Sequence, residues 1–350
     1  MQALLDANEG WASPYGNDPL TKKTVALVRE VFEAPDAAVY FVATGSAANA
    51  LVLGTLTQPF QTVFCTSEAH IHEDECSAPE FFTGGAKLTL VASENALMES
   101  AALQDAIERW GGGNVHGPQP GTVSLTQVTE RGTVYTLDHL EELVRVAKTH
   151  GLPVHLDGAR FANALVSLGA TPAEMSWKLG IDAVSFGGTK NGLMGVEAVI
   201  IFDPQKAWEF ELRRKRGGHL FSKNRYLAAQ MHAYLQDDLW IEMATKANQT
   251  AQSLAEYMQA NPAVSILYPR GANMLFVEMT RALHKKLNEA GAHYYLNGSL
   301  EGADDELVAA RLVVDWSCPD EHVKNFAAVC RGEAPVKGDF ALENGNAING

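Results

Sequence analysis

The sequence predicts an α/β protein, with a large domain built on a seven-stranded, mostly parallel sheet and a smaller α/β domain after it. The chain has 350 residues, more than one small core usually organises, so two domains are expected. Short apolar runs alternate with segments long enough for helices, which indicates βαβ units and a sheet covered on both faces. The seven runs are Ala38–Val42, Thr62–Phe64, Lys87–Val91, Thr122–Thr126, Pro153–Leu156, Ala183–Phe186 and Glu197–Phe202.

The helices are predicted from apolar residues that recur at helical spacing. A polar loop over Trp11–Asp18 leads into a helix over Thr21–Phe32. Between the strands, Ala47–Leu56 and Leu137–Thr149 show the clearest helical patterns. In such folds the loops at the carboxyl ends of the strands build the functional site.

The second half of the chain begins with a basic segment in an acidic protein. We expect a loop over Arg213–Arg225, followed by a long helical stretch over Tyr226–Gln259. After that the pattern changes, and the strands expected for the smaller domain are Val264–Tyr268, Met274–Glu278, Ala292–Leu296 and Ala310–Trp316. The predicted organisation is an N-terminal segment 1–20, a large domain 21–245, a small domain 246–335 and a flexible tail 336–350.

The composition restricts the class of partner. The net charge is −15, which argues against nucleic acid or an anionic membrane as partner. The four cysteines, at positions 65, 76, 318 and 330, have no CxxC spacing, so we expect free thiols and no metal site. No apolar stretch is long enough to cross a membrane, and the first residues do not have the pattern of a signal peptide. These features predict a cytoplasmic protein.

The most informative stretch follows the strand that ends at Phe186. Gly187 and Gly188 end the strand, and Thr189 and Lys190 come next. Most lysines lie in solvent, and Lys190 could be such a loop residue. In a partly dry pocket the pKa of a lysine falls, and the neutral amine can form a Schiff base with an aldehyde.

Thr44-Gly45-Ser46 follows the first strand and opens a helix. Small residues let the backbone approach an anion, and a helix N-terminus offers free N–H groups, so this turn resembles a phosphate cradle. It contains neither GxGxxG nor a Walker sequence. A plain turn with Ser46 as helix cap, and a nucleotide-binding loop, are the alternatives.

His70 and His72 follow the second strand. A neutral imidazole can stack on a cofactor ring, whereas two histidines at this spacing could also bind a metal or be structural. No further ligand is placed convincingly, so we expect no metal. Asp157 and Arg160 follow another strand. They could form a structural ion pair, or Asp157 could hold a proton on a ring nitrogen while Arg160 binds an anionic oxygen.

The order of these signals along the chain is informative. A phosphate loop, a stacking histidine, a carboxylate at a strand end and a lysine at the next strand end are the parts that a pyridoxal 5'-phosphate (PLP) enzyme needs. Because each part follows a different strand, the sheet would bring them together at one edge.

The chain resembles the low-specificity L-threonine aldolases of the aldolase/β-eliminating lyase group, which are fold-type I PLP enzymes. The resemblance covers about residues 7–328. The residues that carry it are Asn8–Trp11, Tyr15–Asp18, Ala43–Ala50, Glu68–His70, Leu125–Glu130, His155–Ala164, Ser185–Gly192, Arg213–Phe221 and Arg311–Val313. It implies a PLP-transferase-like fold with active sites near subunit interfaces of a homodimer or homotetramer.

The resemblance also implies roles for matching residues. Lys190 would bind the cofactor covalently, Asp157 would pair with its ring nitrogen and His70 would stack on its ring. The remaining cofactor contacts would come from Thr44, Gly45, Ser46, Arg160 and Thr189. The substrate would be bound by Arg160, Arg311, Tyr15 and His72, with the basic segment around Lys215, Arg216 and Lys223 near the interface.

Two departures from the family pattern affect the expected activity. Relatives have a further N-terminal segment with a Ser-Asp sequence that contacts the substrate carboxylate, and this chain is expected to lack it. Several relatives also have a histidine in the loop that here reads Gln127-Val128-Thr129-Glu130-Arg131. The base for the substrate hydroxyl therefore stays open among His70, His72 and a bound water.

The implied reaction is the retro-aldol cleavage of β-hydroxy-α-amino acids, such as threonine, allo-threonine or phenylserine, to glycine and an aldehyde. A β-eliminating lyase or an aminotransferase on the same fold would use the same lysine and aspartate. A PLP-binding protein with weak aldolase activity, because of the missing segment, is a further alternative.

Overall fold

The computed structural model describes residues 1–111, 113–333 and 340–341. The predicted tail, 336–350, lies outside the described residues apart from the short strand β15 (Phe340–Ala341). The chain divides into two compact units, which we describe separately. The large unit comprises residues 1–130 and 135–240, and the small unit comprises residues 131–134 and 241–350.

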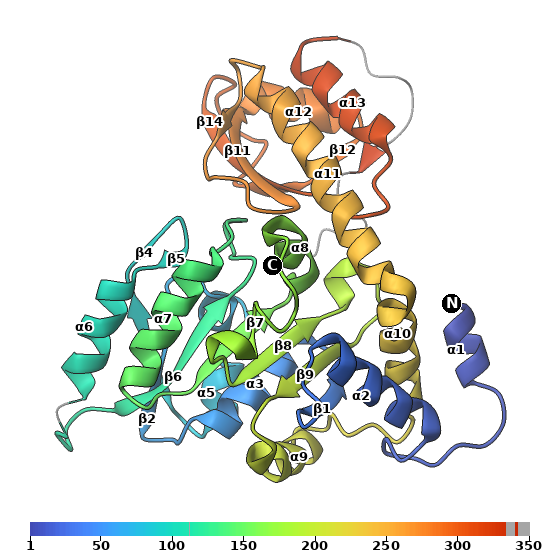
Figure 1. Cartoon of the computed structure of the whole chain (residues 1–350). Helices are drawn as coiled ribbons and strands as arrows, with labels where there is room; N and C mark the ends of the chain where they lie inside the picture. Colours follow the sequence, from blue (N-terminus) through green and yellow to red (C-terminus); the bar gives the residue numbers. More distant parts are fainter. Residues whose placement is uncertain (112, 334–339, 342–350) are drawn as a thin grey trace. The chain divides into compact units, whose positions relative to one another are not determined.

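A seven-stranded sheet forms the centre of the large unit, in the order β1-β9-β8-β7-β6-β2-β3 (Figure 1). Its strands are β1 (Ala38–Val42), β2 (Gln61–Thr66), β3 (Lys87–Val91), β6 (Gln119–Thr126), β7 (Val154–Gly158), β8 (Ala183–Gly187) and β9 (Glu197–Ile201). Strand β9 runs antiparallel to both neighbours, and the other pairs of adjacent strands are parallel. The predicted seven-stranded, mostly parallel sheet is confirmed. All strands except β9 therefore end at one edge, which we call the carboxyl edge.

Helices pack against both faces of this sheet (Figure 1). Helix α3 (Gly45–Leu56) consists almost entirely of small and apolar residues, and it begins at Thr44, whose hydroxyl accepts the Ala47 N–H. Its buried side chains pack on those of β1, β8 and β9. The other helices of the large unit are α1 (Gln2–Ala7), α2 (Pro19–Val31), α4 (His70–Glu73), α5 (Ala78–Thr83), α6 (Ser100–Trp110), α7 (Leu137–Thr149), α8 (Phe161–Leu168), α9 (Ala207–Arg216) and α10 (Arg225–Leu235).

A cluster of aromatic rings closes the face of β8 opposite α3. Phe186 is fully buried, and its ring centroid lies 5.4 Å from that of Phe32 and 5.5 Å from that of Phe161. Tyr234 and Trp240 complete the cluster, at 6.2 and 5.6 Å. Since side chains alternate along a strand, Ala183 and Ser185 face the α3 side. Strand β8, just before Lys190, is thus fixed by packing on both faces.

Two predicted elements between the sheet of the large unit and the small unit differ from the structure. The expected basic loop is partly wrong because its first residues, 213–216, form the last turn of α9, where cations favour the helix C-terminus. The expected long helix is interrupted by a short 3-10 turn, η4 (Gln236–Asp238), between α10 and α11 (Leu239–Gln259). There Asp237 and Asp238 have φ values of 53° and 56°, a conformation that ends an α-helix.

The small unit contains a four-stranded antiparallel sheet in the order β10-β11-β14-β13. Its strands are β10 (Ser265–Ile266), β11 (Met274–Thr280), β13 (Tyr295–Asn297) and β14 (Leu307–Val313), and its helices are α11, α12 (Arg281–Glu289) and α13 (Asp320–Cys330). The predicted run Ala292–Leu296 is split into β12 (Ala292–His293), which pairs with β15, and β13. In the described part of the chain, no helix combines the length and the apolar character needed to cross a membrane.

Candidate active site

The side chains predicted to carry chemistry gather at the carboxyl edge of the large unit. Thr44 follows β1, and His70 begins α4 after β2. Glu130, to which the sequence assigned no role, follows β6 at the same edge. Asp157 lies near the end of β7, and Lys190 lies in a 3-10 turn, η2 (Thr189–Asn191), after β8. The strand order thus brings together residues that are far apart in sequence.

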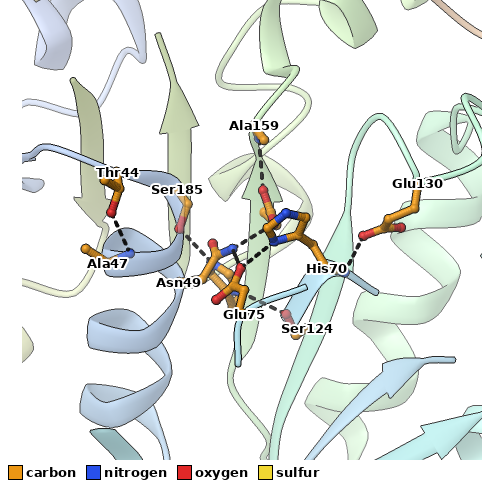
Figure 2. Close-up of polar contacts among 11 residues, drawn as sticks. Thr44, Ala47, Asn49, His70, Glu75, Ser124, Glu130, Ala159 and Ser185 are labelled. Carbon is orange, nitrogen blue, oxygen red and sulfur yellow. Dashed lines mark hydrogen bonds and ion pairs between the residues drawn. The ribbon is translucent and has the colours of Figure 1, made fainter. Parts of the chain in front are cut away.

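Asp157 is buried, with 4% of its surface exposed, and both of its oxygens are hydrogen-bonded. Oδ1 accepts the Ala159 N–H at 2.9 Å, and Oδ2 accepts Asn49 Nδ2 at 2.8 Å. The Asn49 amide also donates to Glu75 Oε1 at 2.8 Å. Asn49 therefore holds two buried carboxylates in one network, which fixes the position of Asp157. Figure 2 shows Asn49 beside Glu75.

Glu75 also binds the ring of His70. His70 Nδ1 lies 2.9 Å from Glu75 Oε1, and the Glu75 side chain is fully buried. This hydrogen bond is the main cause that raises the pKa of His70, whereas partial burial and Lys190 lower it. Because a carboxylate only accepts, Nδ1 carries a proton, and Nε2 of the neutral ring is left as an acceptor.

Replacing Glu75 by glutamine is expected to lower the pKa of His70, since the amide removes the negative charge that stabilises the imidazolium. NMR titration of the histidine ring signals measures this shift. Glu73→Gln serves as the matched control, because Glu73 is exposed and lies 3.5 Å from His72. A His70 pKa that stays in place in Glu75→Gln would contradict the assigned pair.

Lys190 is exposed as a residue, but the surrounding protein reduces the hydration of its amine. Burial, and next the positive charge of Arg160, lower the pKa of Lys190 to about 8, while Asp157, Glu197 and Glu130 act in the opposite direction. A larger fraction of the amine is therefore neutral near neutral pH than in an ordinary lysine.

The turn that carries Lys190 is fixed by hydrogen bonds to the first residue of β9 and to the residue before it. Glu197 is 7% exposed, and its Oε2 accepts the Gly188 N–H at 2.6 Å. The Val196 N–H donates to Thr189 Oγ1 at 3.2 Å. Both contacts hold the two residues just before the lysine, which limits the positions that its amine can reach.

The turn before α3 has the geometry of an anion site. Thr44, not Ser46, is the helix cap, which corrects the expected alternative. A Cβ atom added at Gly45 would meet no atom within 4 Å among the described residues. The turn therefore presents open space at the N-terminus of a 12-residue helix, where backbone N–H groups favour a negative charge.

His155 supports the site from inside the sheet. Its ring nitrogens lie 3.0 Å from Ser124 Oγ and 2.9 Å from Ser185 Oγ, on the two neighbouring strands. Full burial lowers the pKa of His155 to about 4, so the ring is neutral near neutral pH. A neutral, hydrogen-bonded layer thus lies directly below Asp157 in the same strand.

The contacts shown for the other predicted site residues are with groups outside the hydrogen-bond network of Asp157, Asn49, Glu75 and His70. Arg160 is the residue before α8, and its charge acts on Lys190. His72 is exposed and lies near Glu73, whereas the ring of Tyr15 lies 5.1 Å from Lys215 Nζ. Arg311 belongs to the small unit, in β14, with its guanidinium 5.0 Å from the Tyr295 ring. The roles of these residues in substrate binding stay predictions.

Sequence reasoning gave no role to four residues of the site: Asn49, Glu75, Glu130 and Glu197. Asn49 carried a usable signal, because it is a large polar residue in an otherwise small and apolar helix. The three glutamates carried none, since their burial depends on segments that are distant in the sequence.

The strand order, together with a lysine and an aspartate at the ends of adjacent strands, defines a protein of the fold-type I class. The chain belongs to the beta-eliminating lyase family, whose sequence model matches residues 1–282. It is 40% identical over 326 residues to the low specificity L-threonine aldolase of Pseudomonas aeruginosa, covering 93% of this chain and 91% of that protein.

Solved structures show the same relationship. A threonine aldolase from Leishmania major is 28% identical and superposes with a TM-score of 0.87 over 95% of this chain and 96% of that one. A structure of SPT that holds PLP is 18% identical, with a TM-score of 0.67 over 95% of this chain and 83% of that one. At that identity the second likeness shows the fold alone.

Proposed function

We propose that the protein is a PLP-dependent aldolase that cleaves β-hydroxy-α-amino acids to glycine and an aldehyde. The observation that carries this proposal is the buried Asp157, held by Asn49 and the Ala159 N–H at the same edge as Lys190. The names of the similar proteins from Pseudomonas aeruginosa and Leishmania major support the aldolase reaction. Threonine, allo-threonine and phenylserine are the proposed substrate types.

The residues present fit the cofactor. The open turn at Gly45 suits a phosphate group, with Thr44 and Ser46 beside it. Asp157 suits a protonated ring nitrogen, and His70, held by Glu75, offers a flat ring for stacking. Arg160 and Thr189 are the further proposed contacts.

PLP supplies a conjugated ring that withdraws the electron pair left at Cα when the bond to Cβ breaks. Lys190 binds the cofactor through its amine, which its lowered pKa makes a better nucleophile at neutral pH. Asp157 keeps the proton on the ring nitrogen. Arg160 binds the carboxylate of the amino acid, a role that suits its guanidinium group.

The assay for this proposal separates the possible reactions by their products. The purified protein is loaded with PLP and incubated with L-threonine, L-allo-threonine or phenylserine, and aldehyde and glycine are measured. Stoichiometric glycine and aldehyde are expected. Ammonia with a keto acid would instead indicate the β-eliminating alternative, and transfer of the amino group to a keto acid would indicate an aminotransferase. Bound PLP without any cleavage would also contradict the aldolase proposal.

A homodimer or homotetramer in the cytoplasm is part of the same proposal. Exposed apolar side chains support an interface, because Trp208 and Leu212 lie one turn apart on α9 and are 69% and 51% exposed. Four free cysteines are consistent with a reducing compartment.

A further inference from the structure

Glu130 is a further carboxylate at the carboxyl edge. It follows β6, and its Oε1 accepts the backbone N–H of His70 at 2.8 Å. Figure 2 shows its carboxylate directed across to His70. Its second oxygen, Oε2, is buried and has no hydrogen-bond partner among the residues that the structure describes. A buried oxygen without a donor is costly, so such atoms often mark a place where a ligand donates.

Charged and titratable groups from several elements surround this carboxylate. Asp157 in β7 and Lys190 after β8 both interact with it electrostatically, as do Cys65 in β2 and Tyr135. Burial, and then the charge of Asp157, raise the pKa of Glu130 to about 7, whereas the His70 N–H and the Thr126 hydroxyl act against this shift. A base is most effective when its pKa lies near the working pH.

We propose that Glu130 is the base that accepts the β-hydroxyl proton of the substrate, an inference that rests on the proposed aldolase function. In this step the hydroxyl donates its proton to Glu130, the Cβ–O bond becomes a carbonyl and the Cα–Cβ bond breaks. The electron pair of that bond stays with the glycine fragment, which later takes a proton at Cα. The aldehyde leaves, and Glu130 returns its proton to water.

The structure favours Glu130 over the two histidines as this base. His70 keeps Nε2 as an acceptor, but its ring is held by Glu75 and is proposed to lie flat on the cofactor. His72 is exposed and lies 3.5 Å from Glu73. Glu130 as a residue is only partly buried, and rotation about its last side-chain bond can turn either oxygen toward a substrate.

The proposal predicts a specific pH dependence. Glu130 acts as a base only when it is ionised, so kcat for cleavage falls as the pH drops through about 7. Glu130→Gln removes this carboxyl group, so the decrease in kcat at low pH that is assigned to Glu130 disappears from the pH profile. The change in pH profile is a result that a merely structural role for Glu130 would not produce.

The test compares Glu130→Gln, Glu130→Asp and the wild type, all loaded with PLP. Glu141→Gln, an exposed residue on the outer side of α7, is the matched control. Cleavage of L-threonine and phenylserine is measured beside the exchange of the glycine Cα hydrogen in D2O, which needs no hydroxyl base. Before PLP is added, infrared spectra of each protein between about pH 5 and about pH 9 report the titration of the carboxyl group directly.

The expected result is a loss of cleavage on the order of 10²–10⁴-fold in Glu130→Gln, with glycine exchange and bound PLP close to wild type. A carboxyl band that titrates near neutral pH is expected in the wild type and absent from Glu130→Gln. Glu130→Asp keeps an acid and is expected to retain more cleavage than Glu130→Gln. Glu141→Gln is expected to behave as the wild type.

Three outcomes overturn the proposal. If cleavage survives in Glu130→Gln, His70 or water accepts the β-hydroxyl proton of the substrate. Equal losses of cleavage and glycine exchange in both Glu130 variants assign Glu130 a structural role. A wild-type protein that exchanges glycine but cleaves none of the substrates removes the proposed function, and this inference with it.

Discussion

Lys190→Ala is expected to lose at least on the order of 10³-fold in the rate of aldehyde release. The variant lacks the amine that binds the cofactor covalently, whose pKa the site lowers to about 8. The hydrogen bonds of Asp157 and His70 do not involve Lys190 and should survive. PLP should therefore still bind, but more weakly and without a covalent bond, which equilibrium dialysis against free PLP measures.

Lys178→Ala is the control for this variant. Lys178 is an exposed lysine that pairs with Glu33 on the surface, and such surface pairs contribute little to the stability of the fold. Lys178→Ala should leave both turnover and cofactor binding unchanged. An active Lys190→Ala protein, or equal losses in the two variants, would contradict the role of Lys190.

Asp157→Asn is expected to reduce kcat on the order of 10²–10⁴-fold, with a smaller change in KM. The substitution keeps the shape of the side chain and can still accept the Asn49 amide, but it removes the negative charge that keeps the ring nitrogen protonated. Steady-state kinetics with L-threonine at full cofactor occupancy measures the effect. The loss should fall on kcat because the charge matters most when the bond to Cβ breaks.

The control for the aspartate is Asp138→Asn, an exposed residue in the first turn of α7. It should show wild-type kinetics. If Asp157→Asn raised KM while kcat stayed near wild type, Asp157 would act in ground-state binding and not in withdrawing electrons.

The order and type of the large-unit elements could be predicted because their physical causes are local. Apolar runs that end at glycine or polar residues define strands, and the predicted bounds of β1, β3 and α7 match the structure. Lys190 and Asp157 were identifiable for a related reason. A charged residue directly after a buried strand, as at the end of β8, is unusual unless it has a function.

The hydrogen-bond network of the site could not be predicted from local sequence. Asn49 and His70 donate to the buried Glu75, and Glu130 becomes a candidate base only once its burial is known. The interruption at Asp237 was also missed. Two aspartates in a helical pattern look like ordinary surface residues, and only their φ values show that the helix ends there.

The most direct test of the account is to find where the cofactor is attached. The wild-type protein is loaded with PLP and reduced with borohydride, which fixes the link between cofactor and amine, and the peptides are then mapped by mass spectrometry. One modified peptide is expected, with the reduced cofactor on Lys190. Modification of a different lysine, or of none, would contradict it.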